Sequence, residues 1–209
     1  MYSTKTATTN NNEFNSSYMP VGINENVTLK GVNVSKTSQG RDFLEIIFEN
    51  ENGQTATMTE WKNEKNMWIK TDEDLQNRDN QQFGRILQVI DAVCGEHADF
   101  EGNSFTEMIQ WVAQTIMTNK TVLDNAFAKT PTKLRLKVVY DKKGYTTVSK
   151  NGIFVESMDV AESQIKLWKN DLLERPVQPD KEDDPLGSPN IGASTPVTET
   201  NTGADDLPF

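Results

Sequence analysis

The chain has 209 residues, of which 35% are hydrophobic and 25% charged, and its formal net charge is −10; this length suits one domain with extensions or two very small domains. No apolar run approaches the roughly 18 residues that a membrane-spanning helix needs, which excludes that class of protein. A single cysteine, Cys94, and a single histidine, His97, exclude an internal disulfide, a cysteine-based metal cage and most histidine-dependent enzymes.

Both ends of the chain are polar. Residues 1–20 are rich in Thr, Asn and Ser, which predicts a flexible arm. The stretch after Met1 has no apolar segment of the secretory kind, so we expect a cytoplasmic protein, or one in the host cytoplasm if a bacteriophage encodes it. Residues 174–209 combine prolines with Gly, Ser, Thr and acids, which predicts a disordered acidic tail. The predicted folded domain therefore covers residues 21–173.

The first part of this domain alternates as β-strands do. Val27–Val34 alternates apart from Gly31, and a glycine inside such a pattern indicates a bulge or a bend. Arg41–Glu51 and Gln54–Trp61 are predicted strands joined by a hairpin turn at Asn50–Gly53. Period-2 spacing places Leu44, Ile46, Phe48, Ala56 and Met58 inward, and Phe43, Glu45, Ile47, Thr55, Thr57, Thr59 and Trp61 outward.

Helical spacing follows. Leu75–Cys94 has apolar residues three and four apart, which predicts an amphipathic helix ended by Gly95. Ser104, with Glu107 three residues later, is typical of a capping box at the start of a second helix.

After Pro131 the β pattern returns. Lys133–Tyr140 and Tyr145–Val148 are predicted strands, and Ile153–Val155 is a third. We expect a short helix over Ala161–Leu173, which includes Trp168, to close the domain.

These elements predict a mainly β protein with an α insertion. Three strands, helices over about residues 70–130 and two or three further strands fit an OB-fold-like five-stranded Greek-key barrel, in which strands 3 and 4 are commonly connected by a helix. A β-sandwich or a generic α+β domain would give much the same pattern, so both alternatives stay open.

Charge is distributed unevenly along the chain. Residues 171–209 carry nine acids and two cations, a net charge of −7, which leaves −3 for residues 1–170. Residues 129–150 carry seven cations and one acid, a net charge of +6. A basic strand region and an acidic tail therefore coexist, so the negative total does not exclude binding to a polyanion.

The last five residues, Asp205-Asp206-Leu207-Pro208-Phe209, have the features of a compact peptide ligand. The Phe209 ring can enter an apolar pocket, the terminal carboxylate can meet a basic residue, and Pro208 reduces the entropy lost on binding. Asp205 and Asp206 can meet a basic rim and raise the association rate. The alternative is that they simply end an acidic tail.

This tip resembles the C-terminal tip of bacterial and bacteriophage single-stranded-DNA-binding proteins, in which two or three aspartates precede an aliphatic residue, a proline and a final phenylalanine. The order of barrel, polar linker and acidic tip is also similar. The insertion at about residues 70–130 departs from the common bacterial form, which favours a bacteriophage version.

The resemblance implies an OB-fold protein that coats and protects single-stranded DNA, without sequence preference, in DNA replication, recombination or repair. It implies that the tip recruits replication or recombination proteins, such as a polymerase, a helicase-primase or a nuclease, and competes with DNA for the basic groove. A homo-oligomer is one assembly that it allows.

A single-strand binder needs a cationic track for phosphates and aromatic platforms for bases. Period-2 spacing puts three cations of one predicted strand on a common face, more cations follow at the next turn, and one ring ends an otherwise Thr-lined outward face. We therefore predict DNA contacts at Lys133, Arg135, Lys137, Lys142, Lys143, Tyr145, Trp61 and Lys150. The alternatives are a solvated strand face for the cations and packing against the helices for Trp61.

Two rival functions stay open. One is an acidic adaptor or DNA mimic without DNA affinity, consistent with the net negative charge. The other is a metal-dependent nuclease that uses acids such as Asp72 and Asp74. The sequence has no phosphate-binding glycine loop, no G-x-S-x-G and no H-E-x-x-H pattern. We therefore expect no enzyme activity, no cofactor and no metal site.

Overall fold

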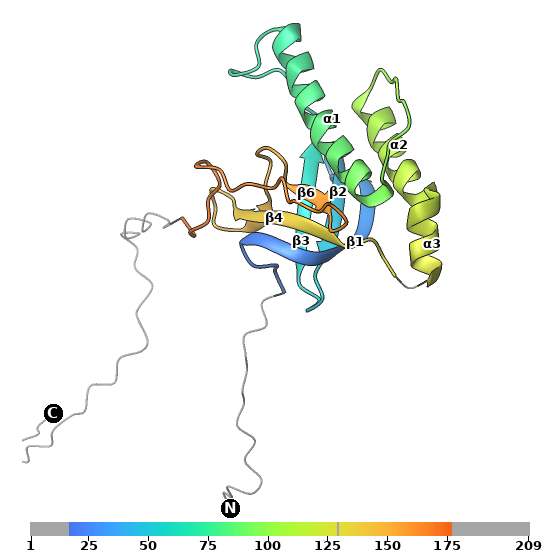
Figure 1. Ribbon diagram of the computed structural model, residues 1–209. Helices are drawn as coiled ribbons and strands as arrows, with labels where there is room; N and C mark the ends of the chain where they lie inside the picture. Colours follow the sequence, from blue (N-terminus) through green and yellow to red (C-terminus); the bar gives the residue numbers. More distant parts are fainter. Residues whose placement is uncertain (1–16, 129, 177–209) are drawn as a thin grey trace, which may run out of the picture. The chain divides into compact units, whose positions relative to one another are not determined.

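The computed structural model describes residues 17–128 and 130–176 (Figure 1). This part of the chain forms six strands and three helices. The elements are β1 (Gly22–Lys36), β2 (Asp42–Glu49), β3 (Thr55–Trp61), α1 (Asp72–Cys94), α2 (Phe105–Thr118), α3 (Lys120–Ala128), β4 (Leu134–Tyr140), β5 (Thr146–Val148) and β6 (Val155–Ser157). Within it, no helix is both long enough and apolar enough to cross a membrane.

The six strands form one antiparallel sheet in the order β3-β2-β1-β4-β5, and β6 pairs with β4 beside β5. The mainly β prediction with a helical insertion is therefore confirmed. The predicted closed barrel is not, because no backbone ladder joins β3 to β5 in the described chain. Two side chains bridge that margin instead: Thr147 Oγ1 donates to the Thr57 carbonyl at 3.4 Å, and Lys150 Nζ donates to the Thr59 carbonyl at 3.2 Å.

The long strand β1 belongs to both halves of the sheet because it bends twice. Its first residues pair with β4, and Thr28–Lys36 pairs with β2. The register shifts where Asn26 has a φ of 57°, and again next to Gly31. These irregularities increase the local twist and turn the strand from one set of partners to the other, as the sequence predicted for Gly31.

The helices cover one side of the sheet and complete its core. In Figure 1, α1 and α2 lie side by side; α1 contacts β6 while α2 packs against β1 and β2. Alternation in β2 and β3 buries Leu44, Ile46, Phe48, Ala56 and Met58, as predicted. Their partners in the core include Ile86, Ile90, Ile109 and Val112 of the two helices.

The helix ends follow their local sequence signals. Helix α1 begins at Asp72, three residues before the predicted start, because Thr71 and Asp74 form a capping box. It ends at Gly95, whose φ is 85°. Ser104 caps α2 by accepting from the Glu107 N–H, as predicted.

The predicted boundary of the N-terminal arm at residue 20 was wrong. Met19 is fully buried, and its N–H donates to the Thr55 carbonyl at 2.9 Å. Tyr18 forms an isolated bridge with Thr55. Ser17–Met19 therefore belong to the sheet, while residues 1–16 of the predicted arm lie outside the described chain.

The helix predicted over Ala161–Leu173 was also wrong, because this segment folds as turns and irregular chain. Its backbone carbonyls accept hydrogen bonds from residues distant in the sequence instead. The Lys166 carbonyl accepts from Lys137 Nζ, and the Leu172 carbonyl accepts from the Tyr140 N–H at 2.8 Å. Tertiary hydrogen bonds thus replace those of a helix.

A buried carboxylate joins α1 to the sheet. Glu60 of β3 is 2% exposed, and its oxygens accept from Gln82 Nε2 at 2.7 Å and from Arg85 at 3.2 Å. Lys150 Nζ lies 3.2 Å from the same carboxylate. Burial alone would raise the pKa of Glu60, but the positive Lys150 and the hydrogen bonds from Arg85 and Gln82 outweigh it and hold the pKa below its ordinary value of 4.5.

This arrangement predicts acid sensitivity with a defined sign. Because the folded-state pKa of Glu60 lies below 4.5, its contribution to stability is complete above about that pH and is lost as the pH falls through the folded value. Glu60→Gln should lower the free energy of unfolding at neutral pH by about 1–3 kcal/mol. In urea unfolding between about pH 5 and about pH 3, it should lose less stability than the wild type.

The control is Glu64→Gln, which changes an exposed acid nearby. Equal pH dependence in Glu60→Gln and the wild type would contradict the role assigned to the buried carboxylate.

Candidate functional site

The exposed aromatic side chain at the end of β3 is part of a built cluster. Trp61 is 37% exposed, and its ring lies 4.8 Å from that of Phe43 on β2, with 33° between the planes. The Arg41 guanidinium lies 5.3 Å from the Trp61 ring centroid, in cation–π range. The outward position predicted for Trp61 is confirmed, and both neighbours restrict the ring.

A small cavity of about 230 Å³ opens beside this ring. Arg41, Lys62 and Lys65 line it together with Trp61 and one acid, Glu64. Arg41 Nη2 donates to the Lys62 carbonyl at 3.0 Å, which holds the guanidinium against the loop after β3. A ring and several cations around one hollow match a ligand that has both a flat base and a negative charge.

A second group of predicted residues lies at the β4–β5 turn. Asp141 Oδ1 accepts from the backbone N–H groups of Lys143 and Tyr145 at 2.8 and 2.9 Å, and Gly144 adopts a φ of 82°. The turn is therefore internally braced. Lys142 and Lys143 are exposed, and the Tyr145 ring is 63% exposed.

These two groups lie toward opposite ends of one sheet margin. Because Thr147 reaches Thr57 and Lys150 reaches Thr59, β5 and the residues after it follow β3 in the same direction. Tyr145 therefore lies toward the Thr55 end and Trp61 at the other. Trp61 lies six residue steps along β3 from Thr55, or roughly 20 Å, a length that suits a few nucleotides of extended chain.

Arg135 and Lys137 of β4 do not line this margin as predicted. Only Lys133 keeps a half-exposed side chain, 3.0 Å from Glu51. The Arg135 side chain is 15% exposed and is held by Glu156 at 3.2 Å and by Glu25 at 3.4 Å. The prediction that Lys133, Arg135 and Lys137 form one open cationic face was wrong, because the chain after β5 covers the face that Arg135 and Lys137 share.

Lys137 has instead become a structural residue. It is fully buried, and its ammonium donates to the carbonyls of Asn151 and Lys166 at 2.8 and 2.9 Å and to Asp171 Oδ2 at 2.9 Å. Three acceptors satisfy its three N–H donors. It is therefore not available to a phosphate.

Asp171 completes this buried pair. Its carboxylate also accepts from the Trp168 N–H at 2.7 Å, from Asn151 Nδ2 at 2.8 Å and from Ser149 Oγ at 2.9 Å. Burial alone would raise the pKa of Asp171, but these hydrogen bonds and that from Lys137 outweigh it and leave the pKa below its ordinary value of 3.8.

Lys150, the last predicted cation, is half exposed. It bridges the Thr59 carbonyl and Glu60 from beyond β5 and so lies at the sheet margin. Sequence reasoning missed Arg41, Lys62 and Lys65. Lys62 and Lys65 follow Trp61 closely in the sequence, whereas Arg41 joins them only because the pairing of β2 with β3 brings the strand ends together.

The acids proposed for a nuclease have structural partners. Asp74 closes the cap of α1, and Asp72 pairs with Lys65 at 2.6 Å. In residues 17–128 and 130–176, no three His, Cys, Asp or Glu side chains gather to hold a metal ion. Cys94 is buried, and burial, with a smaller contribution from Asp91, raises the pKa of its thiol to about 11.

The tip Asp205–Phe209 lies outside the described residues, so its predicted role stays a prediction. No protein-family model matches the sequence, and no curated protein matches it. The function is therefore inferred from geometry and residue chemistry.

The burial of Lys137 in β4 predicts a large difference from Lys133, which directly precedes that strand. Lys137→Ala should lower the free energy of unfolding by about 3–5 kcal/mol, because it leaves Asp171 as an uncompensated buried charge. Lys133→Ala removes a half-exposed ion pair and should cost no more than about 1 kcal/mol. Urea unfolding at neutral pH measures both.

The double variant Lys137→Met, Asp171→Leu should recover part of the loss, because it removes both charges together. Similar small effects for Lys137→Ala and Lys133→Ala would show that Lys137 is not a buried partner in solution.

Proposed function

We propose that this protein binds single-stranded DNA without sequence preference, coats and protects it, and acts in DNA replication, recombination or repair, as expected of a bacteriophage protein of this kind. The observation that carries the proposal is the cluster at the end of β3. There, Trp61 presents an exposed ring that packs at a tilt against Phe43 and is flanked by Arg41. Single-stranded DNA offers the matching groups, since its bases are unpaired and can stack, and its phosphates attract cations.

The strand order supports an open form of an OB-like barrel. Strands β1, β2 and β3 form a meander, the helices lie between β3 and β4, β4 returns beside β1, and β5 runs along β3. OB-folds bind oligonucleotides on the face of strands 2 and 3, between the first hairpin loop and the loop that joins strands 4 and 5. Here that face carries Trp61. The loop between β1 and β2 leads to Arg41, and the loop between β4 and β5 holds Lys142, Lys143 and Tyr145.

Local charge matters more for this function than the total of −10. The acidic tail dominates the total, whereas cations occur at both ends of the β3 margin. Phosphate attraction decays over about 10 Å at 0.1 M salt, so nearby cations determine the electrostatic part of the binding free energy.

The Asp205–Phe209 segment supports a second part of the proposal, which is partner recruitment. Its acids and its apolar Leu-Pro-Phe sequence suit a basic, apolar pocket on a replication or recombination protein. The same acids can compete with DNA for the cations at the sheet margin, so the segment would weaken DNA binding as it recruits partners.

The aromatic cluster predicts how DNA binding responds to substitution. Trp61→Ala should weaken binding of a mixed-sequence single strand of about 30 nucleotides by about 5- to 150-fold, the loss expected for one stacked base. The measurement is a titration with labelled oligonucleotide at low and moderate salt, with the matching duplex as a control. Wild-type affinity should fall as salt rises.

Trp68→Ala is the matched variant, since Trp68 is 82% exposed but lies in the loop after β3 rather than on the strand face. We expect Trp68→Ala to bind the single strand with wild-type affinity. If the wild-type protein fails to bind single strands even at low salt, the acidic-adaptor function replaces this proposal.

Removing residues 205–209 tests recruitment separately. The truncated protein should bind single-stranded DNA as tightly as the full chain, or more tightly, and should lose capture of purified polymerase, helicase-primase or nuclease of the same replication system. Capture on an affinity matrix and the same DNA titration measure the two effects. Weaker DNA binding after truncation would contradict competition between the tip and DNA.

A further inference from the structure

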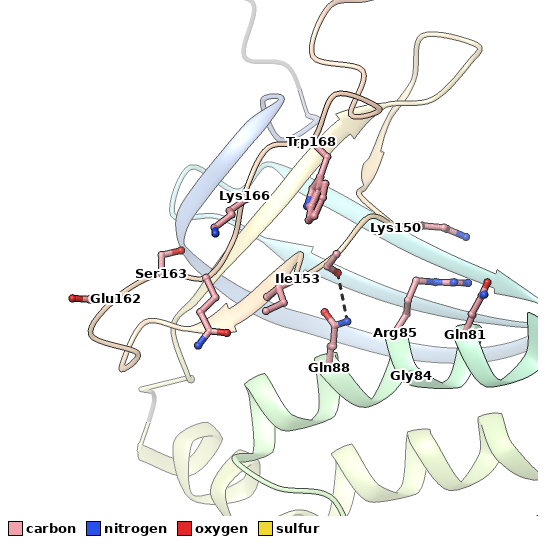
Figure 2. A pocket seen from close by; sticks show the side chains of 12 residues that line it. Gln81, Gly84, Arg85, Gln88, Lys150, Ile153, Glu162, Ser163, Lys166 and Trp168 are labelled. Carbon is pink, nitrogen blue, oxygen red and sulfur yellow. Dashed lines mark hydrogen bonds between the residues drawn. The ribbon is translucent and has the colours of Figure 1, made fainter.

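A large cavity lies beside the proposed DNA-binding margin, between α1 and the chain after β5. Its volume is about 920 Å³. Figure 2 shows Arg85 and Gln88 rising from α1 on one side, with Lys150, Lys166 and Trp168 on the other. None of these residues other than Lys150 belongs to the site described above.

Trp168 provides a flat ring on this cavity. It is 54% exposed, and its indole packs against the backbone of Gly152, where an added Cβ would lie 2.7 Å from Nε1. Gly152 has a φ of 60°, which also disfavours a side chain there. The absence of a side chain at residue 152 is therefore what lets the ring lie in this position.

The backbone of Trp168 is held by the buried ion pair. Its N–H donates to Asp171 at 2.7 Å, its carbonyl accepts from the Asp171 N–H at 2.9 Å, and Lys137 holds the neighbouring Lys166 carbonyl. An exposed ring is thus positioned by buried charges although its segment has no regular secondary structure. Because the ring is already ordered, a base that stacks on it loses little beyond its own freedom.

The polar groups of the cavity suit one phosphate and one base. Arg85, Lys150 and Lys166 contribute three positive charges, which Glu60 and Glu162 offset in part, leaving an excess of one. Gln88 donates weakly to the Gly152 carbonyl at 3.5 Å, and its amide oxygen is buried without a hydrogen-bond partner.

Lys150 connects this cavity to the β3 margin. The same ammonium that lines the cavity donates to the Thr59 carbonyl, two residues before Trp61. A strand that passes along β3 therefore meets Lys150 before it reaches Trp168.

We propose that the cavity between α1 and the chain after β5 binds one further nucleotide of the same single strand, with its base on Trp168 and its phosphate at Lys150 and Arg85. This inference rests on the proposed function and extends its site from the β2–β3 face to the other side of Lys150. It assigns a DNA contact to Trp168.

The test compares a short single strand of about 4 nucleotides with a long one of about 16, spanning the range of known OB-fold site sizes. Trp168→Ala should weaken binding of the long strand by about 5- to 150-fold. Trp168→Phe, which keeps an aromatic ring, should recover most of that affinity. Leu167→Ala is the matched control, because Leu167 is adjacent and similarly exposed but does not line the cavity.

A second measurement is independent of stability. An oligonucleotide that carries 5-iodouracil, irradiated with the full-length wild-type protein, should cross-link to a peptide that contains Trp168.

The outcomes separate the two proposals. If the wild type binds single strands and Trp61→Ala weakens binding, but Trp168→Ala matches the wild type and no cross-link forms at Trp168, this inference is overturned and the proposed function stands. If the wild type binds no single strand at any length, both are overturned. A selective loss in Trp168→Ala, with recovery in Trp168→Phe, supports the inference.

Discussion

The buried ion pair between Lys137 and Asp171 determines how the last part of the domain is arranged. An ammonium inside a protein needs an acceptor for each N–H donor, and Lys137 finds its acceptors in Asn151, Lys166 and Asp171. These bonds draw the chain after β5 across the face of β4. They prevent a local helix, cover the cations of β4 and position Trp168 at the surface.

A second buried charge performs a similar task on the other side of Lys150. Glu60 binds Gln82 and Arg85 of α1 and pairs with Lys150, so the helical insertion is attached to the end of β3. The net stabilisation from such a cluster can be small, because desolvation opposes the attraction, whereas breaking it is costly. Its clear effect is geometric, since it brings α1, β3 and the chain after β5 together around the cavity that Trp168 lines.

The two clusters explain why the exposed rings lie where they do. Trp61 follows directly after Glu60, and the N–H of Trp168 is bound by Asp171. Each ring is therefore attached to a position that buried charges hold in place. For a ligand with many rotatable bonds, such as single-stranded DNA, rigid platforms on the protein limit the entropy lost on binding. The half-exposed Lys150 lies between these platforms and contacts both the sheet margin and the cavity.

Local pattern by itself determined much of this protein. Period-2 alternation correctly predicted the burial of the apolar residues Leu44, Ile46, Phe48, Ala56 and Met58. Gly95 and Ser104 marked helix ends, and the outward position of Trp61 followed from its place in β3. These features depend on residues a few positions apart. Alternation also put Lys137 on a face shared with Lys133, but it could not show what would cover that face. Only the tertiary structure decided that Lys137 is buried, that residues 161–173 are not helical and that Glu60 is paired, because the partner of Lys137 is 34 residues away and Gln82 is 22 residues from Glu60. A charged side chain is buried or exposed according to whether such distant partners can satisfy it.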